Sequence, residues 1–146
     1  MKALQKAIVA QVQAEHAETA SSLPSELQSP EELAIDTGMG ADKEFLQPAA
    51  IRVLPPEDSQ WTPETTNGLE ARMTFPVIVR VKTLASGDTL EALRDVVGLV
   101  IDGISRDHTL GGLCAGPDDP AFKLSAITLQ GGDARQEVAC SFIVRN

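Results

Sequence analysis

Residues 105–116, SRDHTLGGLCAG, bring four chemically active side chains close together in the chain. Ser105, Asp107, His108 and Cys114 supply a hydroxyl, a carboxylate, an imidazole and a thiol, the groups used in nucleophilic catalysis and metal binding. A catalytic triad, however, is defined by geometry rather than by sequence order. The chain lacks the G-x-S-x-G motif of a nucleophile elbow, and no C-x-x-C or H-x-x-x-H pair completes a metal site.

The same segment has the composition of a helix end. Arg106 and His108 follow a strongly helical run, where the helix dipole favours a positive charge. Gly111 comes next and suits the left-handed backbone that often terminates a helix. We therefore interpret the segment as a structural turn, with Leu110 and Leu113 packing back onto the end of the helix.

Other motif-like stretches give no stronger indication of chemistry. GPDDP at 116–120 lacks the spacing of an EF-hand, and TGMGAD at 37–42 lacks the G-K-[S/T] of a phosphate loop. The two cysteines are too few for a disulfide framework, so we expect reduced thiols, with Cys140 buried and Cys114 in a loop. The sequence therefore predicts a protein that is not an enzyme and has no catalytic residues, metal ligands or cofactor.

Length and composition indicate one domain over residues 1–146. The net charge of −9 argues against duplex binding driven by positive charge, and an aromatic content of 3% argues against aromatic platforms for sugars or single-stranded nucleic acid. Polar residues interrupt the N-terminal apolar stretch, so we expect no signal peptide, and no apolar run is long enough to span a bilayer. These features predict a protein made in a reducing compartment, with no membrane partner.

Hydrophobic periodicity predicts an α+β fold with helices over 3–18 and 86–107 and strands in 49–54, 70–82, 121–130 and 135–145. The alternation over 70–82 is the clearest, and Pro76 should place that strand at an edge or a bulge. In the second helix, Asp88 is the expected cap, and Gly98 and Gly103 predict the close approach of a neighbouring element. We expect a largely antiparallel sheet of about four strands with two helices on its apolar face, in the order α, arm, β, β, α, β, β.

An acidic segment at 15–48 interrupts this pattern. It carries seven of the nine net negative charges, together with three prolines and two glycines, and its apolar residues are scattered. We describe the excursion as an arm at 19–48, with a helical turn at SPEELA capped by Ser29. Two interpretations stay open: a solvated flexible arm, or an arm that becomes ordered on a neighbouring subunit.

Basic residues collect on the predicted outer face of the sheet, beside exposed Ile78 and Ile143. In a ring of identical subunits, the acidic arm of one would pair with the basic face of the next as a heterologous interface. Trp61, in a proline-rich loop, either anchors an interface or covers its own loop. The basic face comprises Arg52, Arg72, Arg80, Lys82 and Arg145. The predicted subunit or partner interface comprises Glu31, Glu32, Asp36, Trp61, Arg72, Arg80, Lys82 and Arg145.

The run DTLEALRDVVGLVIDGISRDHTLGGL, followed by an apolar strand and the final EVACSFIVRN, resembles the tail terminator (tail completion) proteins of long-tailed, lambda-type bacteriophages. Those small proteins often have a helix that ends in a D-x-T-L-G-G-L-like turn, and then a β-hairpin whose last strand closes the chain. The resemblance covers roughly residues 70–146, and AAIRVLPPED is consistent with it. The acidic arm is longer than the core of the family leads us to expect.

The resemblance implies a structural virion protein that forms a homo-oligomeric ring, expected to be a hexamer, and that is made in the host cytoplasm. Such a ring caps the tail tube at its head-proximal end, stops its polymerisation and presents a surface to the head-completion or neck protein. Genomic DNA would pass through the lumen without sequence-specific binding. A net-negative subunit suits this role, because a strongly basic lumen would hold the phosphates.

Two alternatives stay open at this point. One is a head-completion or neck protein, which also forms a ring but docks on the portal. The other is a small cytosolic enzyme or ligand-binding domain that uses Asp107, His108 and Cys114.

Overall fold

The computed structural model describes residues 2–37, 47–56, 60–63, 69–82 and 88–145. Within these ranges the chain forms two α-helices, two short 3₁₀ helices and seven strands. In chain order they are α1 (Lys2–Thr19), η1 (Ala20–Ser22), η2 (Ser25–Leu27), β1 (Leu33–Asp36), β2 (Ala49–Val53), β3 (Gln60–Pro63), β4 (Leu69–Val81), α2 (Thr89–Ile104), β5 (Gly116–Leu124), β6 (Thr128–Gln130) and β7 (Asp133–Arg145).

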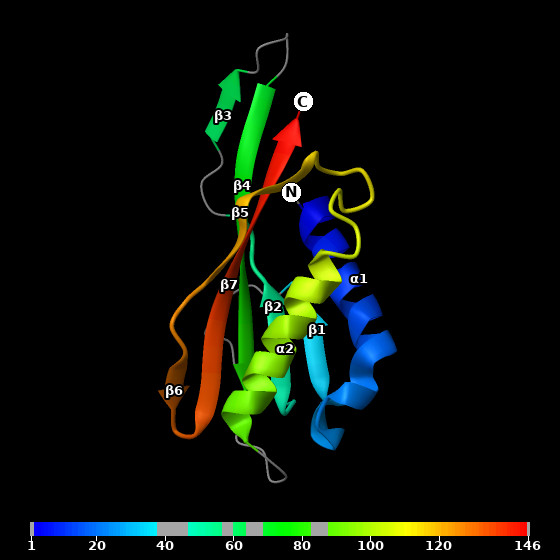
Figure 1. The fold of residues 1–146 in the computed structure, drawn as a ribbon, viewed down its shortest axis with the longest axis vertical. Coiled ribbons are helices and arrows are strands. Elements are labelled where there is room, and N and C mark those ends of the chain that lie inside the picture. Colours follow the sequence, from blue (N-terminus) through cyan, green and yellow to red (C-terminus); the bar gives the residue numbers. More distant parts are fainter. Residues whose placement is uncertain (1, 38–46, 57–59, 64–68, 83–87, 146) are drawn as a thin grey trace.

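All seven strands belong to one mixed sheet with the order β1-β2-β4-β7-β5, in which β3 also pairs with β4 and β6 with β7. Its centre is the long antiparallel ribbon of β4 and β7, in register from Glu70 opposite Arg145 to Val81 opposite Ala134. Helices α1 and α2 lie side by side on one face of the sheet (Figure 1). That face is apolar because every second residue of β4 points to it, and these residues are at most 1% exposed: Ala71, Met73, Phe75, Val77, Val79 and Val81.

The α+β class is as predicted, but the largely antiparallel sheet of about four strands and the proposed order of elements are wrong. The sheet has seven strands, and β1 pairs with β2 in parallel. The strands missed by the pattern are β1 and β3, which contain four residues each, and the strand predicted at 121–130 is divided between β5 and β6. A strand this short shows too little alternation to be recognised, and its place is decided by a partner elsewhere in the chain.

Much of the predicted arm at 19–48 belongs to the folded domain. After α1 ends, η1 and η2 bring Leu23 and Leu27 into the core, and β1 adds Leu33. The Ser29 carbonyl accepts the N–H groups of Glu32 and Leu33 at 3.1 Å, so SPEELA forms a turn that leads into β1. A solvated arm is therefore the wrong description of residues 19–36. Residues 38–46 of the predicted arm lie outside the described residues.

Pro76 lies in β4, a strand paired on both sides, so the prediction of an edge strand is wrong. The Pro76 carbonyl accepts the N–H of Leu54 at 2.9 Å, one residue beyond the end of β2. The nitrogen and carbonyl of one strand residue face the same neighbour, so the Pro76 nitrogen faces the point where β2 has ended. The missing donor therefore falls at the end of the β2–β4 ladder, where only the reciprocal bond to the Leu54 carbonyl cannot form.

The two helices are in close contact at Gly103. A Cβ atom added there would lie 2.9 Å from the Cα of Val12 and 3.2 Å from the Gln11 carbonyl oxygen in α1. Gly98, one and a half turns earlier in α2, has no atom within 4 Å of its added Cβ. The predicted close approach is thus confirmed at Gly103 and wrong at Gly98.

This difference gives a matched pair of substitutions. We expect Gly103→Ala to lower the free energy of unfolding by about 1–3 kcal/mol, because α1 must move away and the layer on the sheet repacks. We expect Gly98→Ala to raise it by about 0.5–1 kcal/mol, because alanine is the better helix former where space is free. Urea unfolding of both variants measures the difference, and equal effects would contradict the close helix contact.

Candidate assembly surface

The SRDHTLGGLCAG segment forms a turn organised by Asp107. Helix α2 ends at Ile104, and the Ser105 N–H donates to the Ile101 carbonyl as the helix cap. The Asp107 carboxylate accepts the Thr109 backbone N–H at 3.0 Å, the Thr109 hydroxyl at 2.8 Å and the Gly111 N–H at 2.8 Å. These hydrogen bonds, the Thr109 hydroxyl first, hold the pKa of Asp107 below its usual value. Asp107 therefore serves as an internal acceptor that fixes the turn.

The left-handed backbone of this turn begins at Leu110, well beyond the end of α2 at Ile104. A glycine that terminates a helix directly would lie close to the last helical residue. Leu110, Gly111 and Gly112 have φ values of 49°, 73° and 86°. Leu110 is the only residue other than glycine with positive φ among the described residues, and its side chain is 1% exposed. Burial of this side chain holds the strained backbone in place. Leu113 is 44% exposed, so the prediction that it packs back on the helix is wrong.

The two thiols of the chain have no activated character. Cys114 is buried, and its Sγ lies 3.5 Å from the His108 carbonyl oxygen. Burial raises the pKa of the Cys114 thiol, and it raises that of Cys140 to about 12, so both thiols are protonated at neutral pH. Among the described residues, no three His, Cys, Asp or Glu side chains come together to hold a metal ion.

The cavity beside the turn is small. It encloses about 70 Å³ and is lined by Ser105, His108 and Ser141 together with apolar residues of α2, β5 and β7. Pockets that bind small molecules enclose about 300–1,000 Å³. The nearby hydroxyls and imidazole therefore have little room for a substrate between them.

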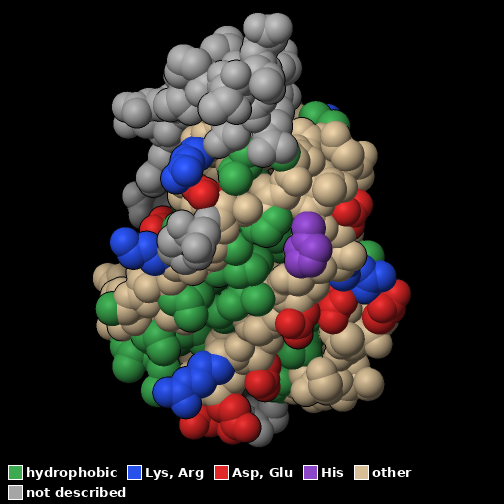
Figure 2. Space-filling view, turned by 45° about the horizontal axis from the view of Figure 1, so that its top comes forward, with side chains coloured by type: hydrophobic (Ala, Val, Ile, Leu, Met, Phe, Trp, Pro, Cys, Tyr) green, Lys and Arg blue, Asp and Glu red, His purple; other side chains and the backbone are tan. Residues whose placement is uncertain are grey.

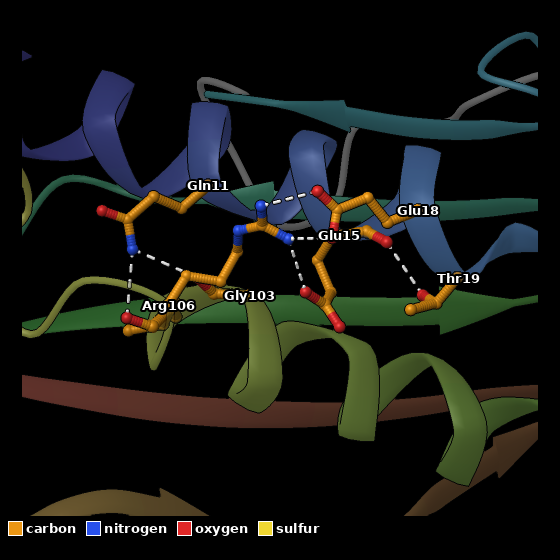
Figure 3. A network of polar contacts seen from close by, with 7 residues as sticks. Gln11, Glu15, Glu18, Thr19, Gly103 and Arg106 are labelled. Carbon is orange, nitrogen blue, oxygen red and sulfur yellow. Dashed lines mark hydrogen bonds and ion pairs between the residues drawn. The ribbon is translucent and has the colours of Figure 1, made fainter.

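A polar network ties the turn to α1 (Figure 3). Arg106 donates to Glu15 at 2.9 Å and to both carboxylate oxygens of Glu18 at 2.8 and 2.9 Å. Gln11 donates from one amide nitrogen to the carbonyls of Gly103 and Ile104, each at 3.1 Å. The hydrogen bond and charge of Arg106 lower the pKa of Glu18, and Glu18 and Glu15 raise that of Arg106 above its ordinary value. We call Gln11, Glu15, Glu18 and Arg106 the helix clamp.

The sequence alone predicts that Arg106 interacts with the helix dipole and that Glu15 and Glu18 belong to the acidic segment. Their three-residue spacing puts both glutamates on one face of α1. That signal was present in the sequence, but nothing local indicates that the face meets the end of α2. Two of the charges of the acidic segment therefore act within the subunit.

The other predicted acidic interface residues lie around β1. Glu31 is exposed, Glu32 is half-buried, and Asp36 lies 3.8 Å from Arg52 of the adjacent strand. Asp42 and Glu44 lie outside the described residues. The acidic character of this region is thus concentrated at one edge of the sheet, where β1 is the terminal strand.

The predicted basic face is largely engaged within the subunit. Arg72 lies 3.6 Å from Asp118 and Arg80 lies 3.4 Å from Asp133, while Lys82 is half-buried. Two expectations for this face are wrong, since Arg52 is 7% exposed and Ile78 is 4% exposed. These two lie opposite each other on the central strand pair of β2 and β4.

Two predicted interface residues are described only through their backbone. Trp61 lies opposite Ala71 in the β3–β4 pair, and Arg145 lies opposite Glu70 at the end of the β4–β7 ribbon. The structure therefore places both residues at the same end of the sheet (Figure 1). Their side chains lie outside the described part of the molecule.

The apolar face of the sheet continues beyond α2. Phe122, Leu124 and Leu129 pair in register with buried residues of β7, so their side chains share the face that carries the helices. Leu124 is nevertheless 49% exposed and Leu129 60% exposed, because α2 packs on β4 and β7 and leaves β5 and β6 uncovered. Figure 2 shows a broad hydrophobic area on this side of the molecule. We call Phe122, Leu124, Ile127 and Leu129 the apolar edge.

A groove of about 440 Å³ lies at the opposite edge of the sheet, between α1 and β1. Its walls include Ala17 of α1, Pro30, and the strand residues Ala34 and Ile35. Gln13, also in the wall, donates to the Ile35 carbonyl at 3.1 Å. We call this feature the β1 groove. Sequence reasoning missed both the apolar edge and the β1 groove, because each depends on which strands end the sheet.

The chain matches no protein-family model and no curated protein sequence. Among the described residues, none of the helices combines the length and the hydropathy needed to cross a bilayer.

The helix clamp predicts a dependence of stability on pH. Because the pKa of Glu18 is lowered in the folded state, its contribution is present above the unfolded pKa of about 4.3 and is lost as the pH falls through the lower folded value. We expect Arg106→Gln to lower the urea midpoint modestly at pH 7 and to have almost no effect once the pH is below the lowered pKa of Glu18, or in high salt. Arg94→Gln, at an exposed position of α2, is the control and should show no such pH dependence.

The buried thiols predict slow modification. We expect a disulfide reagent at pH 7 to label Cys114 and Cys140 at rates far below that of a free thiol, and to label both fully in urea. Rapid labelling of Cys114 in the folded protein would contradict a buried, protonated thiol and would reopen a catalytic interpretation of the turn.

Proposed function

We propose that this chain is a structural virion protein of a long-tailed bacteriophage that forms a ring on the end of the tail tube, as tail terminator proteins do. The ring ends tail polymerisation at the head-proximal end and offers the joining surface for the head-completion or neck protein. The protein is made and assembled in the host cytoplasm. Its homo-oligomer is expected to be a hexamer, with genomic DNA passing through the lumen.

The observation that carries this proposal is the apolar edge. Its two exposed leucines lie on the core face of the sheet, and a neighbouring layer normally covers such a face. A contiguous apolar surface of this kind in a small domain indicates an assembly contact. The resemblance of the α2 end, its DHTLGGL turn and the last strand to tail terminators then suggests the kind of assembly.

The hydrogen bonds that the Asp107 carboxylate accepts within its own turn support a non-enzymatic role. Both carboxylate oxygens bind the turn itself, and the thiols nearby are protonated and buried. The side chains of this segment that could do chemistry thus shape the path of the chain after α2 instead. The net charge of −9 also fits a ring whose lumen lets DNA pass, because few cations are available to neutralise phosphates.

Purified protein and purified tail tubes test this proposal. We expect sedimentation velocity to detect a closed oligomer at micromolar concentration, and negative-stain electron microscopy to show rings on one end of tubes in the absence of portal protein. Tubes capped in this way should stop elongating when more tube protein is added.

Two other outcomes decide against the proposal. Rings that bind portal complexes and ignore tube ends would identify a head-completion or neck protein instead. A monomer that binds neither structure, and whose His108→Ala, Cys114→Ala double variant loses a measurable activity while folding normally, would favour the enzyme or ligand-binding alternative.

A further inference from the structure

We propose that the apolar edge of one subunit docks into the β1 groove of the next copy of the same chain. This inference rests on the proposed ring and names the two surfaces that would build it. The contact is heterologous, because the two surfaces are different, and repetition of such a contact generates a ring when the rotation closes.

The positions of the two surfaces suit a head-to-tail contact. The sheet has β1 at one end of its order and the β5–β6 region at the other, so the groove and the edge lie on opposite sides of each subunit (Figure 1). One subunit can therefore use both surfaces at once. An isologous contact between two apolar edges would instead use the same surface twice and would stop at a dimer.

The groove has walls of suitable chemistry for aliphatic side chains. Ala17, Pro30, Ala34 and Ile35 contribute apolar surface, and the volume of about 440 Å³ lies within the range of sites that accept small apolar groups. Leu124 and Leu129 are the most exposed large hydrophobic residues among those described. Burial of such side chains at the centre of a contact is a main source of binding energy in protein interfaces.

The charges around the two surfaces are complementary. Beside the groove lie Glu31, Glu32 and Asp36, the last of these 52% exposed and 3.8 Å from Arg52. Beside the apolar edge, Arg94 is exposed on the flank of α2 that also carries the half-buried Ile101, whereas the exposed Lys123 lies on the other face of β5. A docked neighbour would place Arg94 against the acidic rim, which favours this orientation over a contact between two like edges.

The groove is suited to side chains rather than to an added strand. In β1, the backbone carbonyl of Ile35 points away from β2, and it already accepts a hydrogen bond from the Gln13 side-chain amide. The Leu33 N–H is likewise bound to the Ser29 carbonyl. These contacts occupy backbone groups that an incoming strand would need. The partner therefore contributes side chains from its edge, and the sheet does not continue from one subunit to the next.

Two interface variants and two matched controls test the contact. Leu129→Glu places a charge in the apolar edge, and Ala17→Arg adds a bulky cation at an exposed position in the groove wall. Leu113→Glu, at an exposed leucine of the turn, and Ala10→Arg, at an exposed alanine of α1 outside the groove wall, are the controls. We expect each interface variant to raise the protein concentration needed for half assembly by about tenfold or more, and each control to leave it unchanged.

Mixing the two interface variants distinguishes the geometry. The Leu129→Glu subunit keeps its groove and the Ala17→Arg subunit keeps its edge, so one intact contact can form between them. A head-to-tail interface therefore predicts that each variant alone is monomeric and that the mixture yields a heterodimer but no ring. Sedimentation velocity with one variant fluorescently labelled measures this, and circular dichroism checks that both variants are folded.

The outcomes separate this inference from the proposed function. Rings that cap tube ends equally well with either interface variant would overturn the edge-to-groove contact while supporting the ring. A wild-type protein that forms only a dimer, lost with Leu129→Glu and retained with Ala17→Arg, would show an isologous edge contact and overturn this inference. A wild-type protein that neither assembles nor binds tubes would overturn both proposals.

Discussion

The close contact of α1 and α2 at Gly103 is the constraint on which the rest of the structure depends. Because Gly103 has no side chain, the backbones of α1 and α2 can touch there, and the two helices form one layer on the sheet. The helix clamp then fixes the end of α2 relative to α1 through Arg106 and Gln11. Because the helices are held together at one side of the sheet, the β5–β6 side has no layer of its own. The surface proposed for assembly is thus a consequence of how tightly the two helices pack.

The same constraint explains why the chemically suggestive turn is structural. After α2 ends against α1, the chain must cross to β5, and the Asp107 carboxylate organises this crossing by accepting three hydrogen bonds. The buried side chain of Leu110 holds an unfavourable backbone angle of 49°. A carboxylate with a lowered pKa is often taken as a sign of a functional site. Here the hydrogen bonds that lower it are those that fix the path of the chain.

Elements with long local patterns could be predicted from the sequence, and those that depend on distant partners could not. The alternation in β4, the Asp88 cap of α2 and the final hairpin carry their signals in neighbouring residues. The strand β1 has four residues and is defined by its parallel pairing with β2. For the same reason, the sequence could not show that Ile78 is covered or that Leu129 is exposed. Both depend on how many strands the sheet has and where the helices end.

The charges of this chain have a different role from the one that their segregation in the sequence implies. Glu15, Glu18 and Arg106 are joined within the subunit, and several arginines of the sheet lie near aspartates of their own chain. Charges already satisfied internally gain little from a partner, since desolvation offsets new attraction. Apolar burial therefore has to supply most of the energy of an assembly contact, with the remaining rim charges selecting its orientation. A ring built in this way would be held by the uncovered part of the core face of each subunit.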